Sequence, residues 1–181
     1  MTKISIVYHS GYGHTKVQAE YVLKGVQSVA GVQAALVTTD EAIKDMAPLS
    51  ASDCIIFGCP TYMGGPSAQF KTFIDAASKI WFQQGWKDKL AAGFTNSQGP
   101  SGDKLNTLQS LLINAMQHSM VWIGTGMLPG DELNRLSSFV GAMSQSPQGQ
   151  KEPIAADLKT AEAFGKRVAE AAVRWVRGRQ G

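Results

Sequence analysis

The sequence predicts an α/β fold in which a parallel sheet is covered by helices on both faces. Two observations support this fold class. Short apolar runs typical of buried strands alternate five times with longer segments whose apolar residues recur every three or four positions, as in amphipathic helices. The chain of 181 residues is 44% hydrophobic and contains no internal repeat, so we expect a single domain over residues 1–181.

The first half of the chain contains three predicted strands. The apolar run 4–7 predicts the first strand, and residues 15–29 repeat apolar positions at the spacing of a helix. The second strand is predicted over 32–37. A polar connection through Pro48 then leads to the third strand at 54–57.

The second half adds three helices and two strands. A long helix is predicted after Gly64-Gly65-Pro66, with the proline in its first turn, where proline is favoured. The fourth strand is predicted over 90–94. A helix marked by leucines between Leu105 and Leu112 precedes the fifth strand at 120–123. The last helix has an apolar face from Ile154 to Trp175, long enough to cover one face of the sheet.

A long segment separates the fifth strand from the last helix. Residues 124–153 are rich in Gly, Ser and Pro. In a compact domain a segment of this length is usually a binding loop or an inserted contact surface. We therefore expect it to leave the domain as a loop excursion.

Composition and charge exclude several classes of protein. No apolar run reaches membrane-spanning length, and the N-terminus enters a strand without a signal-peptide core, so we expect a cytoplasmic protein with no membrane span. Cys54 and Cys59 lie in or beside one strand, a poor arrangement for a disulfide and too few ligands for a metal, so no metal site is expected. The net charge of +3 is mild and its basic cluster marks a helix end, so no nucleic-acid partner is expected.

The stretch from Tyr8 to Thr15 connects the first strand to the first helix and is rich in hydroxyl groups and glycine. The first amides of a helix lack carbonyl partners, and together with the helix dipole they favour an anion. Ser10 and Thr15 add hydroxyl donors, while Gly11 and Gly13 permit close backbone approach or a positive φ. The stretch therefore predicts a phosphate-binding turn, and a capped turn without a ligand is the alternative.

The composition of this turn indicates which phosphate it binds. Residues 10–15 contain no Lys or Arg and lack the Gly-Lys-Ser/Thr ending of a triphosphate-binding loop. Position 16 is Lys16 rather than glycine, so the dinucleotide pattern G-x-G-x-x-G also fails. A phosphate held by neutral donors is typical of flavin mononucleotide (FMN).

Two further loops follow strands whose carboxyl ends meet at one edge of a parallel sheet, where ligands bind. The loop 58–66 contains Tyr62 and Met63, which could cover the faces or edge of an isoalloxazine ring, and glycines that free backbone amides for its polar edge. The loop 95–102 is also neutral and rich in donors. Each loop alone is typical of an ordinary turn, and the joint placement of all three predicts the site.

With these three loops the chain resembles the flavodoxin-like flavoproteins, and most closely the WrbA-type NAD(P)H:quinone oxidoreductases and related FMN reductases. The resemblance spans nearly the whole length. It implies a three-layer sandwich with a five-stranded parallel sheet in the order 2-1-3-4-5. The segments that carry it are Ser10-x-Tyr12-Gly13-His14, Pro60-Thr61-x-x-Gly64, Thr72-Phe73-Ile74-Asp75, Trp81 before Lys89-Leu90-Ala91, and His118-x-Met120-Val121.

The resemblance implies an FMN-dependent oxidoreductase that transfers a hydride from NADH or NADPH through flavin N5 to a quinone-type acceptor. Flavin N5 is then the reactive centre, and His118 is a candidate catalytic residue. Tyr12 and Trp81 are expected near the substrates, with Trp81 at a subunit interface. The expected FMN-binding residues are Ser10, Gly11, Tyr12, Gly13, His14, Thr15, Pro60, Thr61, Tyr62, Met63, Gly64, Gly65, Asn96, Ser97, Gln98, Gly99, Ser101, Gly102, Gln117 and His118.

The chain departs from the family pattern at two places. Tyr62 stands where the family commonly has an arginine that could contact the flavin or an anionic electron donor. Gln117 replaces the first of two paired histidines, so the group at that position can form hydrogen bonds but cannot titrate.

Two other functions share this topology. A flavodoxin-type FMN electron carrier without its own nicotinamide turnover is the alternative, although such carriers are usually strongly acidic and this chain is not. A signalling receiver domain needs an acidic cluster at the strand ends, where this chain has Tyr8, His9 and Cys59. We therefore exclude the receiver domain.

Assembly is predicted from apolar groups without an obvious place in one domain. Trp81, Phe82 and Trp86 follow a helix and are expected to be exposed, and residues 124–153 have no evident core role. We therefore expect a homodimer or homotetramer in which Trp81 or its neighbours help to wall a partner's flavin pocket.

Overall fold

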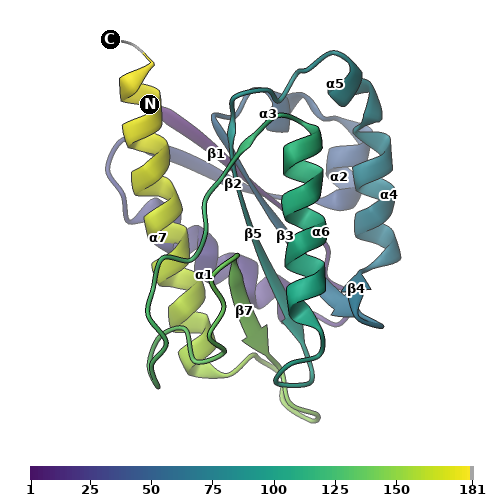
Figure 1. Ribbon diagram of the computed structural model, residues 1–181, viewed down its shortest axis with the longest axis vertical. Coiled ribbons are helices and arrows are strands. Elements are labelled where there is room, and N and C mark those ends of the chain that lie inside the picture. Colours follow the sequence, from purple (N-terminus) through teal and green to yellow (C-terminus); the bar gives the residue numbers. More distant parts are fainter. Residues whose placement is uncertain (180–181) are drawn as a thin grey trace.

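The computed structural model describes residues 1–179 and has three layers (Figure 1). A central sheet is covered on one face by helices α1 (His14–Gln27) and α7 (Ala155–Gly178), and on the other by α4 (Ala68–Ala76) and α6 (Lys104–Gln117). The predicted α/β fold class with helices on both faces is confirmed.

The main strands of the sheet are parallel and lie in the order β2-β1-β3-β5-β6. This order confirms the predicted arrangement 2-1-3-4-5, with β5 as the fourth strand. The strand bounds are β1 (Thr2–Tyr8), β2 (Val32–Thr38), β3 (Cys54–Tyr62), β5 (Leu90–Ser97) and β6 (Val121–Trp122).

The fifth strand is split into two short pieces, which the sequence did not indicate. β6 pairs with the start of β5, and β7 (Ala142–Gln145) pairs with its end, from Phe94 to Ser97. Residues 123–141 leave the sheet, and the chain returns to it in β7 before the loop that leads to α7. The expectation that residues 124–153 have no core role is wrong, because Ala142 and Ser144 are completely buried. A strand of four residues with two polar side chains carries too weak a pattern to be recognised in sequence.

Strands β3 and β5 extend beyond their predicted ends, so two of the predicted loops are shorter than expected. β3 continues to Tyr62 and forms an antiparallel hairpin with β4 (Gly65–Pro66). The two residues between them, Met63 and Gly64, have φ values of 47° and 77°. Two positive φ angles are typical of the tight turn that matches the twist of a hairpin.

The helix after this hairpin begins at Ala68, later than predicted, and is interrupted. Ser67 is its N-cap and accepts a hydrogen bond from the Phe70 amide at 3.3 Å, so Pro66 belongs to β4 and not to the first helical turn. After Ala77 a second short helix, α5 (Ser78–Phe82), follows α4. The predicted polar connection near Pro48 also forms two short helices, α2 (Thr39–Lys44) and α3 (Ala47–Ser50).

An aromatic cluster fills the core beneath α4. Phe73 and Trp86 are stacked with ring centroids 6.4 Å apart, and the Trp86 indole N–H donates to Ser50 Oγ at 3.0 Å. The expectation that Trp86 is exposed is wrong, since it is completely buried. Trp81 and Phe82 are exposed as expected, at 46% and 82%.

All the parallel strands point in one direction, so their carboxyl ends meet at one edge of the sheet, at the bottom of Figure 1. The loops that leave these strands are therefore brought together there. Within residues 1–179, no helix combines the length and the apolar character needed to cross a membrane.

Candidate functional site

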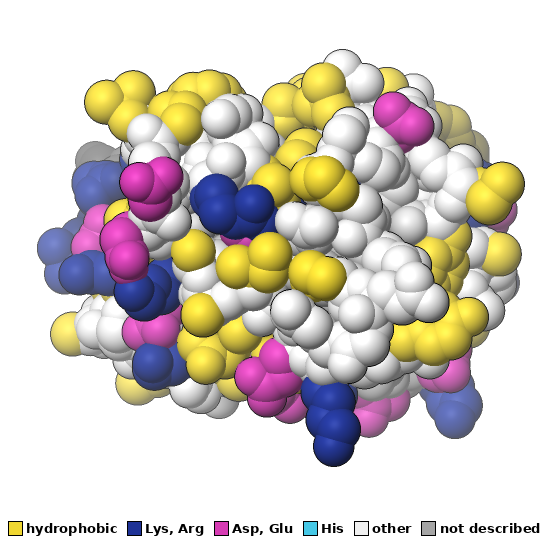
Figure 2. All heavy atoms as spheres, turned by 90° about the horizontal axis from the view of Figure 1, so that it is seen from below, with side chains coloured by type: hydrophobic (Ala, Val, Ile, Leu, Met, Phe, Trp, Pro, Cys, Tyr) yellow, Lys and Arg dark blue, Asp and Glu magenta, His cyan; other side chains and the backbone are white. Residues whose placement is uncertain are grey.

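A cavity of about 530 Å³ opens at the carboxyl ends of β1, β3 and β5. None of the side chains that line it is Asp, Glu, Lys or Arg. Figure 2 shows this end of the molecule, where apolar and uncharged polar side chains occupy most of the middle and most charged groups lie toward the margin. The lining residues are Tyr12, His14, Thr15, Pro60, Thr61, Tyr62, Met63, Asn96, Ser97, Gln98, Ser146, Pro147, Gln148, Gly149 and Gln150.

The first wall is the turn before α1. Its N-cap, Gly13, has a φ of 91°, which explains a glycine at this position. The amides from Tyr12 to Thr15 donate to no backbone or side-chain acceptor in the described part of the chain. Ser10 Oγ accepts a hydrogen bond from the Lys16 amide at 3.1 Å, so this hydroxyl caps the helix. The turn therefore presents several free donors at the start of a 14-residue helix.

Close approach of two tyrosines shapes the mouth of this turn. The rings of Tyr12 and Tyr62 meet edge to face, with centroids 6.1 Å apart. A Cβ on Gly11 would lie 2.6 Å from the Tyr62 hydroxyl oxygen, so glycine is needed there for the approach. Burial raises the pKa of Tyr62, and this phenol remains protonated at neutral pH.

The second wall contains a chain of threonine hydroxyls. Thr61 Oγ1 donates to Thr107 Oγ1 at 2.7 Å and lies 2.8 Å from Thr95 Oγ1. A hydroxyl has one proton, so Thr95 must be the donor to Thr61. Thr61 lines the cavity. Because its proton is already donated to Thr107, its hydroxyl can act toward a ligand only as a hydrogen-bond acceptor.

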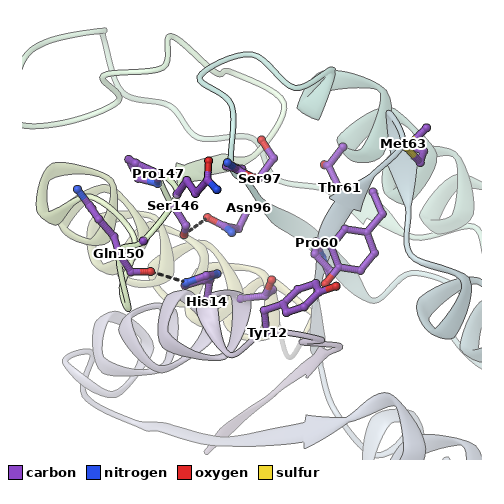
Figure 3. Close-up of a pocket in the computed structure, with 15 residues that line it drawn as sticks. Tyr12, His14, Pro60, Thr61, Met63, Asn96, Ser97, Ser146, Pro147 and Gln150 are labelled. Carbon is purple, nitrogen blue, oxygen red and sulfur yellow. Dashed lines mark hydrogen bonds between the residues drawn. The ribbon is translucent and has the colours of Figure 1, made fainter.

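The third wall is held by Asn96. Its side-chain oxygen accepts a hydrogen bond from Ser144 Oγ at 2.8 Å. It accepts another from Ser146 Oγ at 2.9 Å (Figure 3). Its amide nitrogen forms no hydrogen bond within the described residues and is therefore available as a donor. Asn96 thus connects β5 to β7 and offers two N–H groups at the wall of the cavity.

The fourth wall, residues 146–150, was not identified residue by residue from the sequence. The predicted excursion 124–153 includes it and was expected to be a binding loop or a contact surface. His14 Nε2 lies 3.0 Å from the Gln150 carbonyl oxygen and donates to it, which joins the start of α1 to this loop (Figure 3). The only local signal was the turn composition Ser-Pro-Gln-Gly, which many loops share.

Several predicted FMN-binding residues lie beside the cavity and do not line it. Ser10 and Gly13 line a smaller hollow of about 240 Å³ on the other side of the turn. Gly102, with a φ of 55°, supports Ser97, because a Cβ there would lie 2.5 Å from Ser97 Oγ. The other predicted FMN-binding residues of the three loops that lie outside the lining are Gly11, Gly64, Gly65, Gly99 and Ser101.

The structure places Gln117 and His118 at the opposite edge of the sheet. α6 begins beside the cavity and runs for 14 residues, which is about 21 Å, so its C-terminal end is far from the cavity. The His118 ring lies 4.4 Å from that of Trp86, and burial lowers its pKa to about 4. Neither residue lines the cavity of its own chain, because the helix runs antiparallel to the strands, and their contact with FMN stays a prediction.

Trp81 belongs to α5, which lies at the same far edge after α4 (Figure 1). It can contact a ligand in such a cavity only when the cavity belongs to another copy of the chain, as was expected, and this contact remains a prediction. Tyr12, by contrast, lines the cavity and is 81% exposed.

The cavity contains few groups for acid–base or covalent chemistry. Cys59 is completely buried beside it, and burial raises the pKa of its thiol to about 12. Among residues 1–179 no group of three or more His, Cys, Asp or Glu is placed to hold a metal ion. The arrangement is suited to binding an anionic group at the helix start and a flat polar group between the walls.

Comparisons with known proteins place the chain among flavoproteins. The model of the NADPH-dependent FMN reductase family matches residues 13–132. "Flavodoxin FldP" from Pseudomonas aeruginosa is 40% identical over 93% of this chain and 96% of its own length. "NAD(P)H dehydrogenase (quinone)" from Archaeoglobus fulgidus is 32% identical over 95% and 98%. The crystal structure of the flavodoxin, WrbA-like protein from Agrobacterium tumefaciens is 43% identical, covers 96% of this chain and 99% of its own, and has a TM-score of 0.79.

Proposed function

Because the chain belongs to the NADPH-dependent FMN reductase family, it is an oxidoreductase that works with FMN and a nicotinamide nucleotide, and we propose that it uses them to reduce a quinone-type acceptor. The FMN would lie in the cavity at the carboxyl ends of β1, β3 and β5. Quinone reduction is suggested by the printed name of a relative that aligns over nearly its full length.

The residues of the cavity fit FMN. The free amides from Tyr12 to Thr15 and the dipole of α1 provide donors for a phosphate, and no carboxylate lines the cavity to repel it. Thr61 offers an acceptor and Asn96 offers two donors, so the walls match a ring whose polar edge carries both N–H and C=O groups. These unsatisfied donors and acceptors are the observation that carries the proposal.

FMN supplies the redox chemistry when bound, because its ring can accept two electrons from a nicotinamide and release them to an acceptor. The task of the chain is to bind, orient and shield the ring. Thr61 and Asn96 fix its polar edge, the turn at Tyr12 fixes the phosphate, and the loop 146–150 covers the cavity through the bond between Gln150 and His14. Catalysis then depends on holding two planar substrates in turn against one face.

Titration with FMN and with riboflavin tests the binding site. FMN should bind at least 100-fold more tightly, because several hydrogen bonds to a charged phosphate contribute about 1.5–3 kcal/mol each. The variant Thr15→Val should weaken FMN but leave the weaker binding of riboflavin unchanged. Equal affinities for the two ligands would refute the phosphate assignment.

Anaerobic mixing with NADH or NADPH tests the activity. Either nucleotide should bleach the bound FMN, and a quinone should restore its absorbance, with parallel lines in initial-rate plots for alternating substrates. Absence of turnover with both nucleotides would exclude the reductase.

An FMN electron carrier is the second candidate, favoured by the relative named as a flavodoxin. It predicts that neither nicotinamide reduces the protein, whereas a separate reductase does. The net charge of +3 favours the enzyme, since carriers commonly use an acidic surface to dock to partners.

We further propose that Tyr12 contacts the electron donor and that Trp81 completes the pocket of a second subunit in a homodimer or homotetramer. The exposure of Tyr12 at the cavity and of Trp81 at the far edge supports these roles.

A further inference from the structure

A buried lysine lies behind the third wall of the cavity, at a position where a helix does not favour a positive charge. Lys104 is the first residue of α6, where the helix dipole disfavours cations, and only 1% of it is exposed. Its ammonium group donates to Ser97 Oγ at 2.8 Å, to the Gly99 carbonyl at 2.7 Å and to the Pro100 carbonyl at 3.0 Å. These three bonds use all its protons.

The charge of Lys104 has no direct counter-ion among residues 1–179. None of its three acceptors is a carboxylate. Asp157 of α7 and Arg135 act on it from a distance and are paired with each other at 2.9 Å. Burial lowers the pKa of Lys104 to about 8, so the group is still mainly protonated at neutral pH. A buried, unpaired charge is costly unless a negative group comes near it.

One hydroxyl separates this charge from the cavity. Ser97 lines the cavity, accepts the bond from Lys104, and donates its own proton to the Gly99 carbonyl at 3.0 Å. The residues on either side of Ser97, Asn96 and Gln98, also line the cavity. Lys104 is therefore a fixed positive charge immediately behind a wall that has no charged side chain of its own.

We propose that Lys104 is a positioning residue whose charge stabilises reduced FMN relative to oxidised FMN in the cavity. The proposal rests on the proposed function, because it requires FMN to lie against Ser97. In reduction the ring takes two electrons and one proton from the reduced nicotinamide, which leaves in its oxidised form, and the ring gains one negative charge. A positive charge nearby lowers the energy of that product.

The test compares Lys104→Met with a charge-retaining variant, Lys104→Arg, and with a matched control, Lys89→Met. Lys89 is also partly buried and donates to a backbone carbonyl, that of Ser52 at 2.7 Å, but it lies at the amino end of β5, away from the cavity. For each protein, the dissociation constant of oxidised FMN is measured by fluorescence titration, and the midpoint potential by equilibration with a reference dye.

Lys104→Met should weaken the binding of reduced FMN roughly tenfold more than the binding of oxidised FMN. This is the order of magnitude expected for one charge about 10 Å away at an effective dielectric constant of about 20. For a two-electron couple this is a fall of about 30 mV in the midpoint potential. Lys104→Arg and Lys89→Met should retain the wild-type potential. If Lys104→Met does not fold, Lys104→Gln replaces it, because its amide can still donate to two of the three acceptors.

Two results would overturn the proposal. One is an unchanged midpoint potential in Lys104→Met, with the affinities for oxidised and reduced FMN lowered equally. Lys104 would then only support the structure of the loop. The other is the same shift in Lys104→Arg as in Lys104→Met, which would attribute the shift to geometry. Failure of the wild type to bind FMN at all is a distinct result, since it would remove the proposed function itself.

Discussion

Replacement of Asn96 by alanine should destabilise the protein and weaken FMN binding together. The Asn96 side-chain oxygen is the acceptor for both Ser144, which is completely buried, and Ser146, which is 3% exposed. Each hydroxyl left without an acceptor costs about 1–3 kcal/mol, so Asn96→Ala should lower the free energy of unfolding by roughly 2–6 kcal/mol. The lost amide donor should also weaken FMN by about tenfold, the value of one hydrogen bond.

Chemical denaturation of the protein without cofactor measures the first effect, and a double-mutant cycle tests its cause. Ser144→Ala alone should cost about 1 kcal/mol, because it removes one hydrogen bond. In the Asn96→Ala background the same change should cost little or be stabilising, since it removes a hydroxyl that already lacks its partner. Additive costs would show that the two side chains do not interact, and the reasoning would then fail.

The remaining predictions concern packing, titration, steric fit and assembly. Trp86→Ala should lower the free energy of unfolding by about 3–5 kcal/mol, because it leaves a large cavity in the aromatic core. Phe82→Ala, at an exposed site, should change this free energy little. Equal effects of the two variants in thermal unfolding would contradict this packing. Burial lowers the folded-state pKa of His118 from 6.5 to about 4. The free energy of unfolding should therefore decrease by roughly 3 kcal/mol as the pH falls from above 6.5 to 4, because the unfolded state binds the proton first. His118→Phe should remove most of this dependence, and an unchanged profile of unfolding free energy against pH would refute the titration. Gly11→Ala should weaken the binding of FMN, because the new Cβ displaces Tyr62. The double variant with Tyr62→Phe lacks the hydroxyl oxygen at 2.6 Å and should recover part of the FMN affinity in a fluorescence titration. If no affinity is recovered, the clash lies elsewhere. Trp81→Ala should raise the KM for the quinone without changing FMN affinity if the residue walls a partner's pocket, and a monomer in light scattering with full activity would exclude that role.

The local signals of the sequence were sufficient for most of the secondary structure and for three of the four cavity walls in outline. Strands such as β1 and helices such as α7 depend on apolar periodicity, which lies entirely in neighbouring residues. The phosphate turn was recognisable for the same reason, because its glycines and hydroxyls lie directly between a strand and the helix that they open. The ends of β3 and β5 were placed too early, because their last residues are polar or glycine-rich and become strand only through pairing with neighbours.

Only the tertiary structure decided where distant segments meet. β7 is too short and too polar to be recognised alone, yet its pairing with β5 brings Ser144 and Ser146 onto Asn96 and carries residues 146–150 to the cavity. Lys104 has no distinguishing signal in the local sequence, and only the tertiary structure places the loop before it on its ammonium group. His118 shows the converse, because the chain reverses direction in α6 and carries this residue to the opposite edge of the sheet. The sequence by itself determined the elements and the phosphate turn, since these depend on neighbouring residues, whereas the completed cavity and its buried charge depend on contacts between residues far apart in the chain.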